Sequence, residues 1–487
     1  MIKVLQVSAE LVPLVKTGGL ADVAGALPAA LNQAGVDVRL LLPGFPAFRE
    51  SLSGECAVAP LSLPWGEGRA ALLRGRLAGH GDTVVYLLDA PGLFERPGNP
   101  YADEAGVAYA DNHRRFALLG LAAARLAEGL DAQWLPQVVH AHDWHAALSC
   151  AHLAASRARQ RSRAKSVFTV HNLAYQGLFP ASAFCELGLP PAFYAVEGAE
   201  FYGQVSFMKA GLHFADAITT VSPTYAREIQ TPEQGCGLDG LLRHRASVLH
   251  GILNGVDSKI WSPDHDRSIA QAYSVERPEG KADCKAALQR ECGLDVKPEA
   301  LLFGIVSRLT EQKGLPLVLE ALPDLLEAGG QLVVLGSGDA RLDKAFADAA
   351  ARHPHQVSRR TGMDEGLAHR IYAGSDVVLV PSRFEPCGLT QLYGLSYGAL
   401  PLVHRVGGLA DTVVDCTLED LAAGTATGFV FDAFTADAYR RALRRAFVLW
   451  SRPEYWARVR TAGMRQRLGW DEAARRYVQV YRGMLES

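Results

Sequence analysis

Residues 16–23 read Lys-Thr-Gly-Gly-Leu-Ala-Asp-Val, and residues 407–413 read Gly-Gly-Leu-Ala-Asp-Thr-Val. Each stretch follows an apolar run that is typical of a strand, and each begins a segment that is typical of a helix. A Gly-Gly pair at a helix N-terminus leaves backbone N–H groups bare, and anions are favoured there. Two such stretches, one in each half of the chain, predict two domains that grip a phosphorylated substrate in a cleft.

Short apolar runs alternate with longer helix-like stretches along most of the chain. Many of the runs are continuous, as in strands that are covered on both faces of a parallel sheet. Segments 116–129 and 438–449 are rich in Ala, Leu and Arg, which favour helices. The alternation is typical of βαβ units, so the fold class is α/β. The expected strands are Val4–Val7, Val38–Leu42, Val84–Leu88, Val138–His140, Val167–Val170, Ile218–Val221, Val248–Leu253, Leu301–Val306, Leu332–Leu335, Val377–Val380, Leu400–Val403 and Phe429–Phe431.

The length of 487 residues predicts two or three domains. A polar segment with several prolines and glycines, 263–280, interrupts the alternation and reads as a linker or a surface excursion. We therefore expect an N-terminal domain over 1–253 and a C-terminal domain over 254–465. The last part, 466–487, is expected to form a helix that is apolar on one face and crosses back onto the first domain.

The composition argues against several classes of protein. The net charge is -3, so no strong field attracts nucleic acid or anionic lipid. The N-terminus lacks the core of a signal peptide, and no stretch approaches the ~20 apolar residues of a membrane helix. The eight cysteines form no C-x-x-C pair, which argues against a zinc ribbon or a redox motif. We expect a cytoplasmic enzyme of unknown oligomeric state.

Two stretches follow expected strands of the second half and carry candidate ligands for a phosphorylated sugar. Ser307–Gly314 contains Arg308 and Lys313, which suit a diphosphate or are simply solvated cations. In Pro381–Thr390, the amides of Gly388 and Leu389 would point at a ligand from the start of a helix. Glu385 either accepts hydrogen bonds from sugar hydroxyls or caps the helix and interacts favourably with its dipole.

Two further patterns are weaker. His140-Ala141-His142 with His171 has the residue types of a metal site, although contacts to a sugar or a neighbouring loop fit it better. Gly394-Leu395-Ser396-Tyr397-Gly398 matches a nucleophile elbow, but the residues before the serine read as a helix rather than the required strand.

Taken together, the motifs resemble the family of bacterial glycogen synthases and plant starch synthases. The resemblance covers residue 1 to the last helix, and its motifs occur in order and with similar spacing. They are 16–23, His140–His145, His171–Gly177, Asn254–Asp257, Ser307–Gly314, Glu385–Tyr393 and 407–413.

This resemblance implies a GT-B fold, in which two Rossmann-like domains with parallel sheets face each other across a deep cleft. It implies transfer of glucose from ADP-glucose to the 4-hydroxyl at the non-reducing end of an α-1,4-glucan, with retention of configuration and without a metal or cofactor. The catalytic residues that it implies are His171, Arg308, Lys313 and Glu385. The donor-binding residues are Lys16, Gly18, Gly19, Asn254, Met363, Cys387, Gly388, Leu389 and Thr390. The residues on the acceptor or sugar side are Asp22, Asp143 and Asn172.

Met363 departs from the family pattern, because relatives often carry an aromatic residue at this position against the nucleotide base. A thioether can also pack on a ring. ADP-glucose is the expected donor, and UDP-glucose is the alternative. Three other functions stay open: a GT-B enzyme with a small acceptor, a metal-dependent hydrolase, and a glucan-binding protein without activity.

Overall fold

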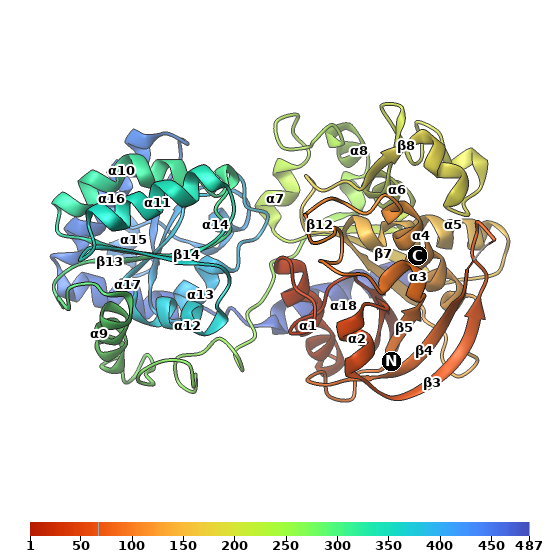
Figure 1. Cartoon of the computed structure of the whole chain (residues 1–487), viewed down its shortest axis with the longest axis horizontal. Coiled ribbons are helices and arrows are strands. Elements are labelled where there is room, and N and C mark those ends of the chain that lie inside the picture. The colour runs from red at the N-terminus through yellow and green to blue at the C-terminus, as the bar shows by residue number, and fades with distance from the viewer. Residues whose placement is uncertain (67, 487) are drawn as a thin grey trace. The chain divides into compact units, whose positions relative to one another are not determined.

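The computed structural model describes residues 1–66 and 68–486, and they form two compact units. Unit 1 contains Met1–Gly255 together with Trp470–Ser487, and unit 2 contains Val256–Gly469. Figure 1 shows the path of the chain through each unit. The chain thus leaves unit 1 after Gly255, beside the expected boundary at 253/254, and returns to it at Trp470, where the expected boundary was 465/466.

Unit 1 is built on a nine-stranded sheet of order β12-β11-β7-β6-β1-β2-β5-β4-β3. The seven strands from β12 to β5 are parallel, and β4 and β3 continue the sheet in antiparallel fashion. The strands are β1 Ile2–Val7, β2 Val36–Pro43, β3 Leu52–Leu61, β4 Ala70–Leu77, β5 Val85–Asp89, β6 Val138–His142, β7 Lys165–Val170, β11 Ala217–Thr220 and β12 Leu249–Gly251.

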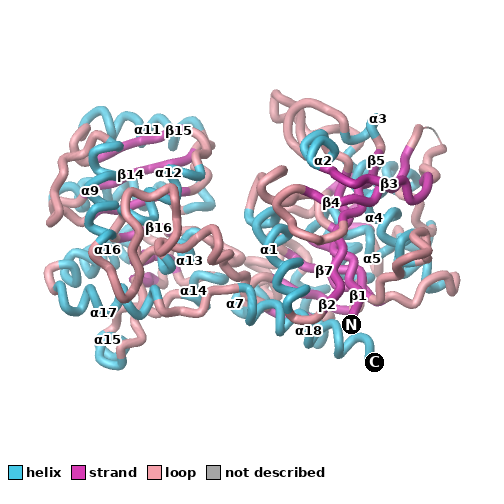
Figure 2. Tube along the Cα trace, turned by 90° about the horizontal axis from the view of Figure 1, so that it is seen from below, coloured by secondary structure: helices cyan, strands magenta, loops and turns pink. Residues whose placement is uncertain are grey.

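Helices cover both faces of this sheet. Residues Val4, Val38, Val138 and Val167 share a hydrophobic core with α1 (Gly19–Gln33) and α18 (Trp470–Glu486). Figure 2 shows these two helices side by side. Phe168 points to the opposite face, where it packs between α5 and α6. The remaining elements of unit 1 are α2 Pro46–Ser51, α3 Pro91–Phe94, α4 Asn112–Ala127, α5 Asp143–Ala158, β8 Leu178–Pro180, η1 Ala181–Glu186, η2 Pro191–Phe193, β9 Glu200–Phe201, β10 Gln204–Ser206, α6 Phe207–Phe214, α7 Pro223–Glu228, α8 Asp239–His244 and η3 Ala246–Val248.

Unit 2 is built on a six-stranded sheet in which neighbouring strands are parallel, with the order β15-β14-β13-β16-β17-β18. Figure 1 shows α10, α11 and α16 on one face and α9, α12 and α13 on the other, and each set has its own hydrophobic core. The strands are β13 Leu302–Val306, β14 Gln331–Gly336, β15 Val357–Thr361, β16 Val377–Val380, β17 Leu400–His404 and β18 Phe429–Phe431. The helices are α9 Gly280–Cys292, η4 Glu311–Lys313, α10 Leu315–Glu327, α11 Ala340–Arg352, α12 Glu365–Gly374, α13 Thr390–Ser396, α14 Gly407–Thr412, α15 Leu418–Ala423, α16 Ala436–Trp450 and α17 Pro453–Met464.

The segment before α9, expected to be a linker or a surface excursion, is anchored to unit 2. Trp261 is stacked between His369 and Tyr393, with 3.9 Å between ring centroids on each side. The hydroxyl of the buried Tyr273 donates to the carbonyl oxygen of Tyr397 at 2.8 Å. Tyr273 therefore anchors the segment 263–280 to unit 2, and Trp261 anchors the residues just before it.

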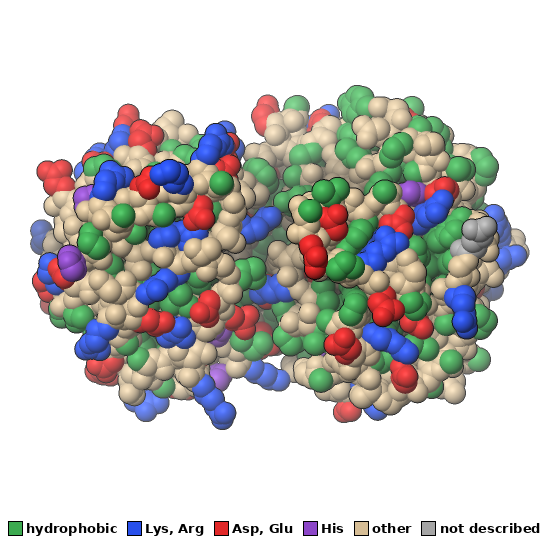
Figure 3. Space-filling model, viewed as in Figure 1, with side chains coloured by type: hydrophobic (Ala, Val, Ile, Leu, Met, Phe, Trp, Pro, Cys, Tyr) green, Lys and Arg blue, Asp and Glu red, His purple; other side chains and the backbone are tan. Residues whose placement is uncertain are grey.

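The surface of each unit carries both signs of charge. On the face shown in Figure 3, Lys and Arg side chains are interspersed with Asp and Glu. This mixture agrees with a net charge of -3. Over residues 1–66 and 68–486, no helix is both long and apolar enough to cross a membrane.

Candidate functional site

Two loops of unit 2 lie together because the strands before them are neighbours. β13 pairs in parallel with β16, so the carboxyl ends of both strands reach the same edge of the sheet. The loop after β13 includes η4, and the loop after β16 leads into α13. The prediction that both stretches follow strands is confirmed, and in open α/β sheets this edge is where ligands bind.

Lys313 and Glu385 form the centre of this arrangement. The ammonium of Lys313 lies 2.5 Å from Oε2 of Glu385, and the hydroxyl of Ser382 donates to the same oxygen at 2.9 Å. The two charged side chains are only 19% and 10% exposed, so water screens the pair weakly. The structure thus brings together two predicted residues that are distant in sequence.

The backbones of the two loops are also joined. The N–H of Arg383 donates to the carbonyl oxygen of Gln312 at 2.8 Å. Gly314 has a φ of +69°, and a Cβ added there would lie 1.8 Å from the carbonyl oxygen of Pro381. Because a side chain at Gly314 would collide with backbone, the close approach of the loops depends on this glycine.

The start of α13 holds the next group of predicted residues. Leu389 precedes the helix and Thr390 is its first residue, as expected for Pro381–Thr390. The side-chain amide of Gln391 donates from Nε2 to the carbonyl oxygens of Cys387 and Gly388, both at 2.9 Å. Gly388 has a φ of +71°. These bonds fix the turn that carries the helix N-terminus.

The interpretation of the second Gly-Gly pair needs correction. α14 begins at Gly407, as predicted, but the N–H of Gly408 donates to the carbonyl oxygens of Glu385 and Pro386 at 3.2 and 3.0 Å. A Cβ on Gly407 would lie 2.0 Å from the carbonyl oxygen of Glu385. The pair therefore packs against the loop of Glu385 and supports it, rather than offering a bare N–H at Gly408 to an anion.

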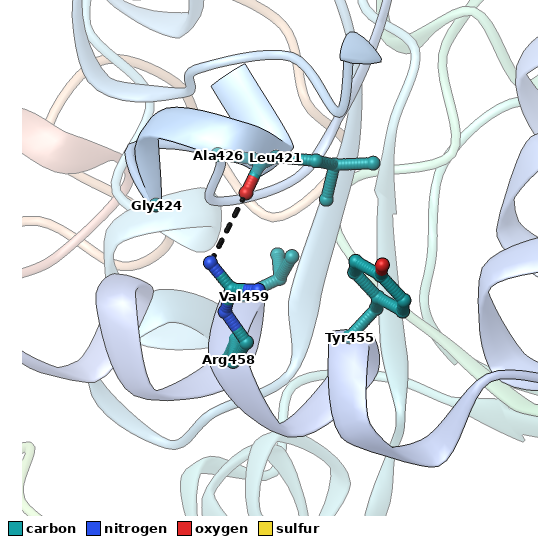
Figure 4. A pocket seen from close by; sticks show the side chains of 6 residues that line it. All are labelled: Leu421, Gly424, Ala426, Tyr455, Arg458 and Val459. Carbon is teal, nitrogen blue, oxygen red and sulfur yellow. Dashed lines mark hydrogen bonds between the residues drawn. The ribbon is translucent and has the colours of Figure 1, made fainter. Parts of the chain in front are cut away.

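Other predicted residues of unit 2 are exposed. The side chain of Arg308 is exposed after β13, and Met363 is 78% exposed after β15. A hollow of about 400 Å³ borders the joined loops and is lined by Glu311, Arg383 and Phe434, among others. A cavity of about 10 Å³, shown in Figure 4, lies elsewhere and is lined by none of the predicted residues; there Arg458 donates to the carbonyl oxygen of Leu421 at 3.4 Å.

In unit 1, the first Gly-Gly stretch is held by a carboxylate that the sequence reasoning did not select. Glu10 accepts hydrogen bonds from the N–H of Thr17 at 2.7 Å and of Gly18 at 3.3 Å. It also accepts one from the hydroxyl of Tyr101 at 2.5 Å. α1 begins at Gly19, as predicted. A buried acid shortly after the end of β1 was the signal that could have identified Glu10.

Within the same stretch, Lys16 and Asp22 form an ion pair of 2.7 Å. Gly18 and Gly19 are exposed, and no atom lies within 4 Å of a Cβ built on Gly18. The two predicted polar side chains therefore contact each other. The prediction of bare N–H groups at this Gly-Gly pair is wrong for Gly18, because its N–H donates to Glu10.

Asp143 lies at the junction of β6 and α5, with a φ of 55°. Its Oδ1 accepts hydrogen bonds from the N–H groups of His171 and Asn172, at 2.8 and 3.3 Å. Burial raises the pKa of Asp143 to about 7, against the lowering effect of these two hydrogen bonds. The structure thus joins three predicted residues through the backbone that follows β7.

The histidines of this region are buried or half-buried and contact one another. Nδ1 of His142 lies 2.9 Å from Nε2 of His171, and Nδ1 of His140 lies 2.8 Å from the hydroxyl of Tyr481 on α18. Burial lowers the pKa of His140 and of His171 to about 3. Among the described residues, no three His, Cys, Asp or Glu side chains are grouped so that they could hold a metal ion.

Two predicted asparagines have different surroundings. Oδ1 of Asn172 accepts from the N–H of Ala174 at 3.0 Å. Oδ1 of Asn254 is buried without a hydrogen-bond partner among the described residues. Asn254 stands directly before Gly255, the last residue of the first part of unit 1.

Comparisons with known proteins point in one direction. A family model described as "Starch synthase catalytic domain" matches residues 3–244, and one described as "Glycosyl transferases group 1" matches residues 293–459. The chain is 59% identical to a glycogen synthase of Variovorax paradoxus (strain S110), over 100% of this chain and 99% of that one. It is 56% identical to a glycogen synthase of Francisella tularensis subsp. novicida (strain U112), over 99% of both chains. Among solved structures it is similar to the catalytic domain of starch synthase IV from Arabidopsis thaliana bound to ADP and acarbose, with a TM-score of 0.90, 30% identity and full coverage of both chains.

Proposed function

This chain belongs to the glycogen and starch synthase family of GT-B glycosyltransferases, and from that premise we propose which of its residues carry the reaction. The enzyme elongates an α-1,4-glucan: glucose moves from ADP-glucose to the 4-hydroxyl at the non-reducing end, and ADP is released. The anomeric configuration of the glucose is retained.

One observation carries the assignment of residues: the ammonium of Lys313 on the carboxylate of Glu385, at the carboxyl edge of a parallel sheet. A cation that neutralises phosphate and an acid that orients a sugar are the two groups that a sugar diphosphate requires side by side. Both hydrogen bonds to Glu385 end on Oε2, which leaves Oε1 as the oxygen that a glucose hydroxyl would reach.

Departure of ADP is the step that needs electrostatic help. As the bond from the anomeric carbon to the phosphate oxygen breaks, the sugar becomes oxocarbenium-like and the phosphate gains negative charge. Arg308 and Lys313 would neutralise that charge, and the N–H groups at the start of α13 would add their dipoles. Fixed charges of this kind are usually the largest contribution to such a rate.

For retention we propose attack of the acceptor on the face from which ADP leaves. The new bond joins the acceptor oxygen to the anomeric carbon, and the departing phosphate oxygen takes the acceptor proton. The alternative is double displacement through Glu385, as in retaining glycosidases. Glu385 is already held by Lys313 and Ser382, which favours a positioning role; trapping of a glucosyl adduct on Glu385 would contradict the proposal.

The residues of unit 1 are proposed to act on the same sugar and on the glucan. His171 would contact the reacting glucose, and Lys16 with the exposed Gly18 and Gly19 would contact the donor. Asp22, Asp143 and Asn172 would serve the acceptor or sugar side, with Asp143 acting through the backbone that it holds. The remaining donor contacts are proposed for Asn254, Met363, Cys387, Gly388, Leu389 and Thr390.

No metal or cofactor is proposed to take part, because Arg308 and Lys313 supply the positive charge. We also propose a cytoplasmic location. All eight cysteines are free in the structure, which suits a reducing compartment. The exposed Met363 is proposed to lie against the nucleotide base, where its thioether can pack on either adenine or uracil.

The test is release of nucleotide from ADP-glucose and from UDP-glucose, each with glycogen and with small sugars as acceptors. We expect release of ADP that depends on glycogen. Release with small sugars alone would indicate a different GT-B enzyme, and binding of glycogen without any release would indicate a protein without activity. Hydrolysis that depends on added metal would indicate the hydrolase.

A further inference from the structure

We propose that His142 is a positioning residue that fixes the tautomer of His171, so that His171 presents an N–H donor from Nδ1 to the substrate. The inference rests on the proposed function, because it describes how His171 meets the reacting sugar. It starts from the ring contact at the ends of two neighbouring strands. His142 is the last residue of β6, and His171 directly follows β7.

The two rings are close enough to share one hydrogen bond. Nδ1 of His142 and Nε2 of His171 are 2.9 Å apart, which is the length of a hydrogen bond. Such a bond holds a single proton, on one nitrogen or on the other. A neutral imidazole has one N–H and one lone pair, so the choice sets the tautomer of both rings.

The second nitrogen of His142 decides between the two arrangements. Nε2 of His142 is buried and has no hydrogen-bond partner among the described residues. If His171 donated, the only proton of His142 would lie on this Nε2, and a buried N–H would have no acceptor. If His142 donates from Nδ1, Nε2 keeps only a lone pair, which is the smaller penalty, since orphaned buried N–H groups are rare in proteins.

The protonation of the rings agrees with this choice. Burial lowers the pKa of His171 to about 3 and that of His142 well below its usual value, so both rings are neutral at neutral pH. The ring of His140 lies 4.2 Å from that of His142, and its own pKa is lowered by burial as well. With His142 donating to Nε2 of His171, the single proton of His171 is on Nδ1.

The backbone of His171 is held by the neighbour of His142. Asp143 accepts the N–H of His171 at 2.8 Å, while His142 contacts its ring. Two consecutive residues at the β6–α5 junction thus fix the position and the ring of His171. A ring with a proton on Nδ1 donates to a sugar or phosphate oxygen and cannot accept the acceptor proton there, which fits transfer of that proton to the departing phosphate.

The direct test is the tautomer of His171 in the free wild-type protein. Long-range ¹H–¹⁵N spectra of protein labelled on its 15 histidines distinguish protonated from bare ring nitrogens, and a His171→Gln variant identifies the signals of His171. We expect Nδ1 of His171 and Nδ1 of His142 to carry the protons. A proton on Nε2 of either ring would overturn the inference.

Substitutions at His142 give a second readout. His142→Asn keeps an N–H donor on Nδ2, close to the former Nδ1, whereas His142→Asp offers only an acceptor and His142→Leu offers neither. We expect kcat within about threefold of wild type for Asn, and losses of about tenfold for Asp and Leu, the loss that a broken hydrogen bond of this kind produces. Equal kcat for Asn and Asp would overturn the inference.

The control is His152→Leu, which removes a buried histidine of α5 that has no proposed role in the reaction. We expect it to leave kcat unchanged even if it lowers the melting temperature. The spectra require no turnover, so they are independent of the assay. Wild-type protein that fails to use ADP-glucose while carrying the Nδ1 proton would refute the proposed function and leave the tautomer assignment standing.

Discussion

Lys313 is the residue that the account depends on most, because its ammonium lies between the two loops that are proposed to hold the diphosphate. Loss of one fixed charge of this kind typically lowers the rate about 10²–10³-fold. We expect Lys313→Ala to lose kcat in that range without a change in fold, as measured by nucleotide release and circular dichroism. The matched control is Lys344→Ala, whose exposed ammonium pairs with Asp348. Near-normal turnover in Lys313→Ala would refute its role.

Asp143 predicts a dependence of stability on pH. Burial raises its pKa to about 7 in the folded protein, from the ordinary value of 3.8. A raised pKa contributes stability that is fully present below about pH 4 and is lost as the pH rises through 7. Between pH 5 and pH 8, the free energy of unfolding of the wild type should therefore fall relative to that of Asp143→Asn, by about 1 kcal/mol or more. Denaturant titrations of both proteins at pH 5 and pH 8 measure this change. The same difference in unfolding free energy between wild type and variant at both pH values would contradict the raised pKa of Asp143.

At the scale of elements, the approach of the two loops of unit 2 depends on Gly314. An added Cβ would meet the carbonyl oxygen of Pro381, so Gly314→Ala must separate the loop of Lys313 from that of Glu385. We expect at least a tenfold loss of kcat, since the charged groups would no longer be in place. Gly329→Ala is the matched control: its φ of +80° carries a similar cost of about 1 kcal/mol, but nothing lies within 4 Å of the added atom. Equal activity of the two variants would show that the loop contact is dispensable.

Most of the strands that sequence reasoning predicted are buried on both faces; β12, at a sheet edge, is the exception. Each of the continuous apolar runs corresponds to a strand, from β1 to β18. Strands β3, β4 and β15 were missed: β3 and β15 lie at sheet edges and β4 lies beside β3. All three are partly exposed, and they carry polar residues such as Arg359 and Arg360. For the Gly-Gly pair at 407–408, the prediction of a helix start was right and the prediction of a bare N–H was wrong for Gly408. The acceptors of the Gly408 N–H come from a loop about twenty residues away.

In the candidate site, the motifs identified the loops but not the partners that fix them. The ion pair of Lys313 with Glu385 joins two motifs that were read separately. Glu10, Ser382 and Tyr101 were missed. Glu10 and Ser382 stand close in sequence to the residues that they hold, Thr17 and Glu385, but neither has a residue type or spacing that marks it as a ligand. Tyr101 reaches Glu10 from a distant part of the chain. Spacing along the chain carries no information about such contacts.

For the whole molecule, the different roles proposed for the two units predict different effects of substitutions in each unit. Arg308 and Lys313 of unit 2 are proposed to hold the diphosphate, whereas His171 of unit 1 is proposed to contact the sugar. We therefore expect His171→Ala to keep its affinity for ADP within about twofold and to lose kcat, while Lys313→Ala weakens ADP binding at least tenfold. Calorimetric titration with ADP measures both affinities. A loss of ADP affinity in His171→Ala as large as that in Lys313→Ala would contradict this division.

The most direct measurement is a crystal structure of the enzyme soaked with ADP. We expect the β-phosphate to lie within hydrogen-bond distance of the guanidinium of Arg308 and of Nζ of Lys313, next to the start of α13. A pyrophosphate bound away from both of these side chains would contradict this expectation.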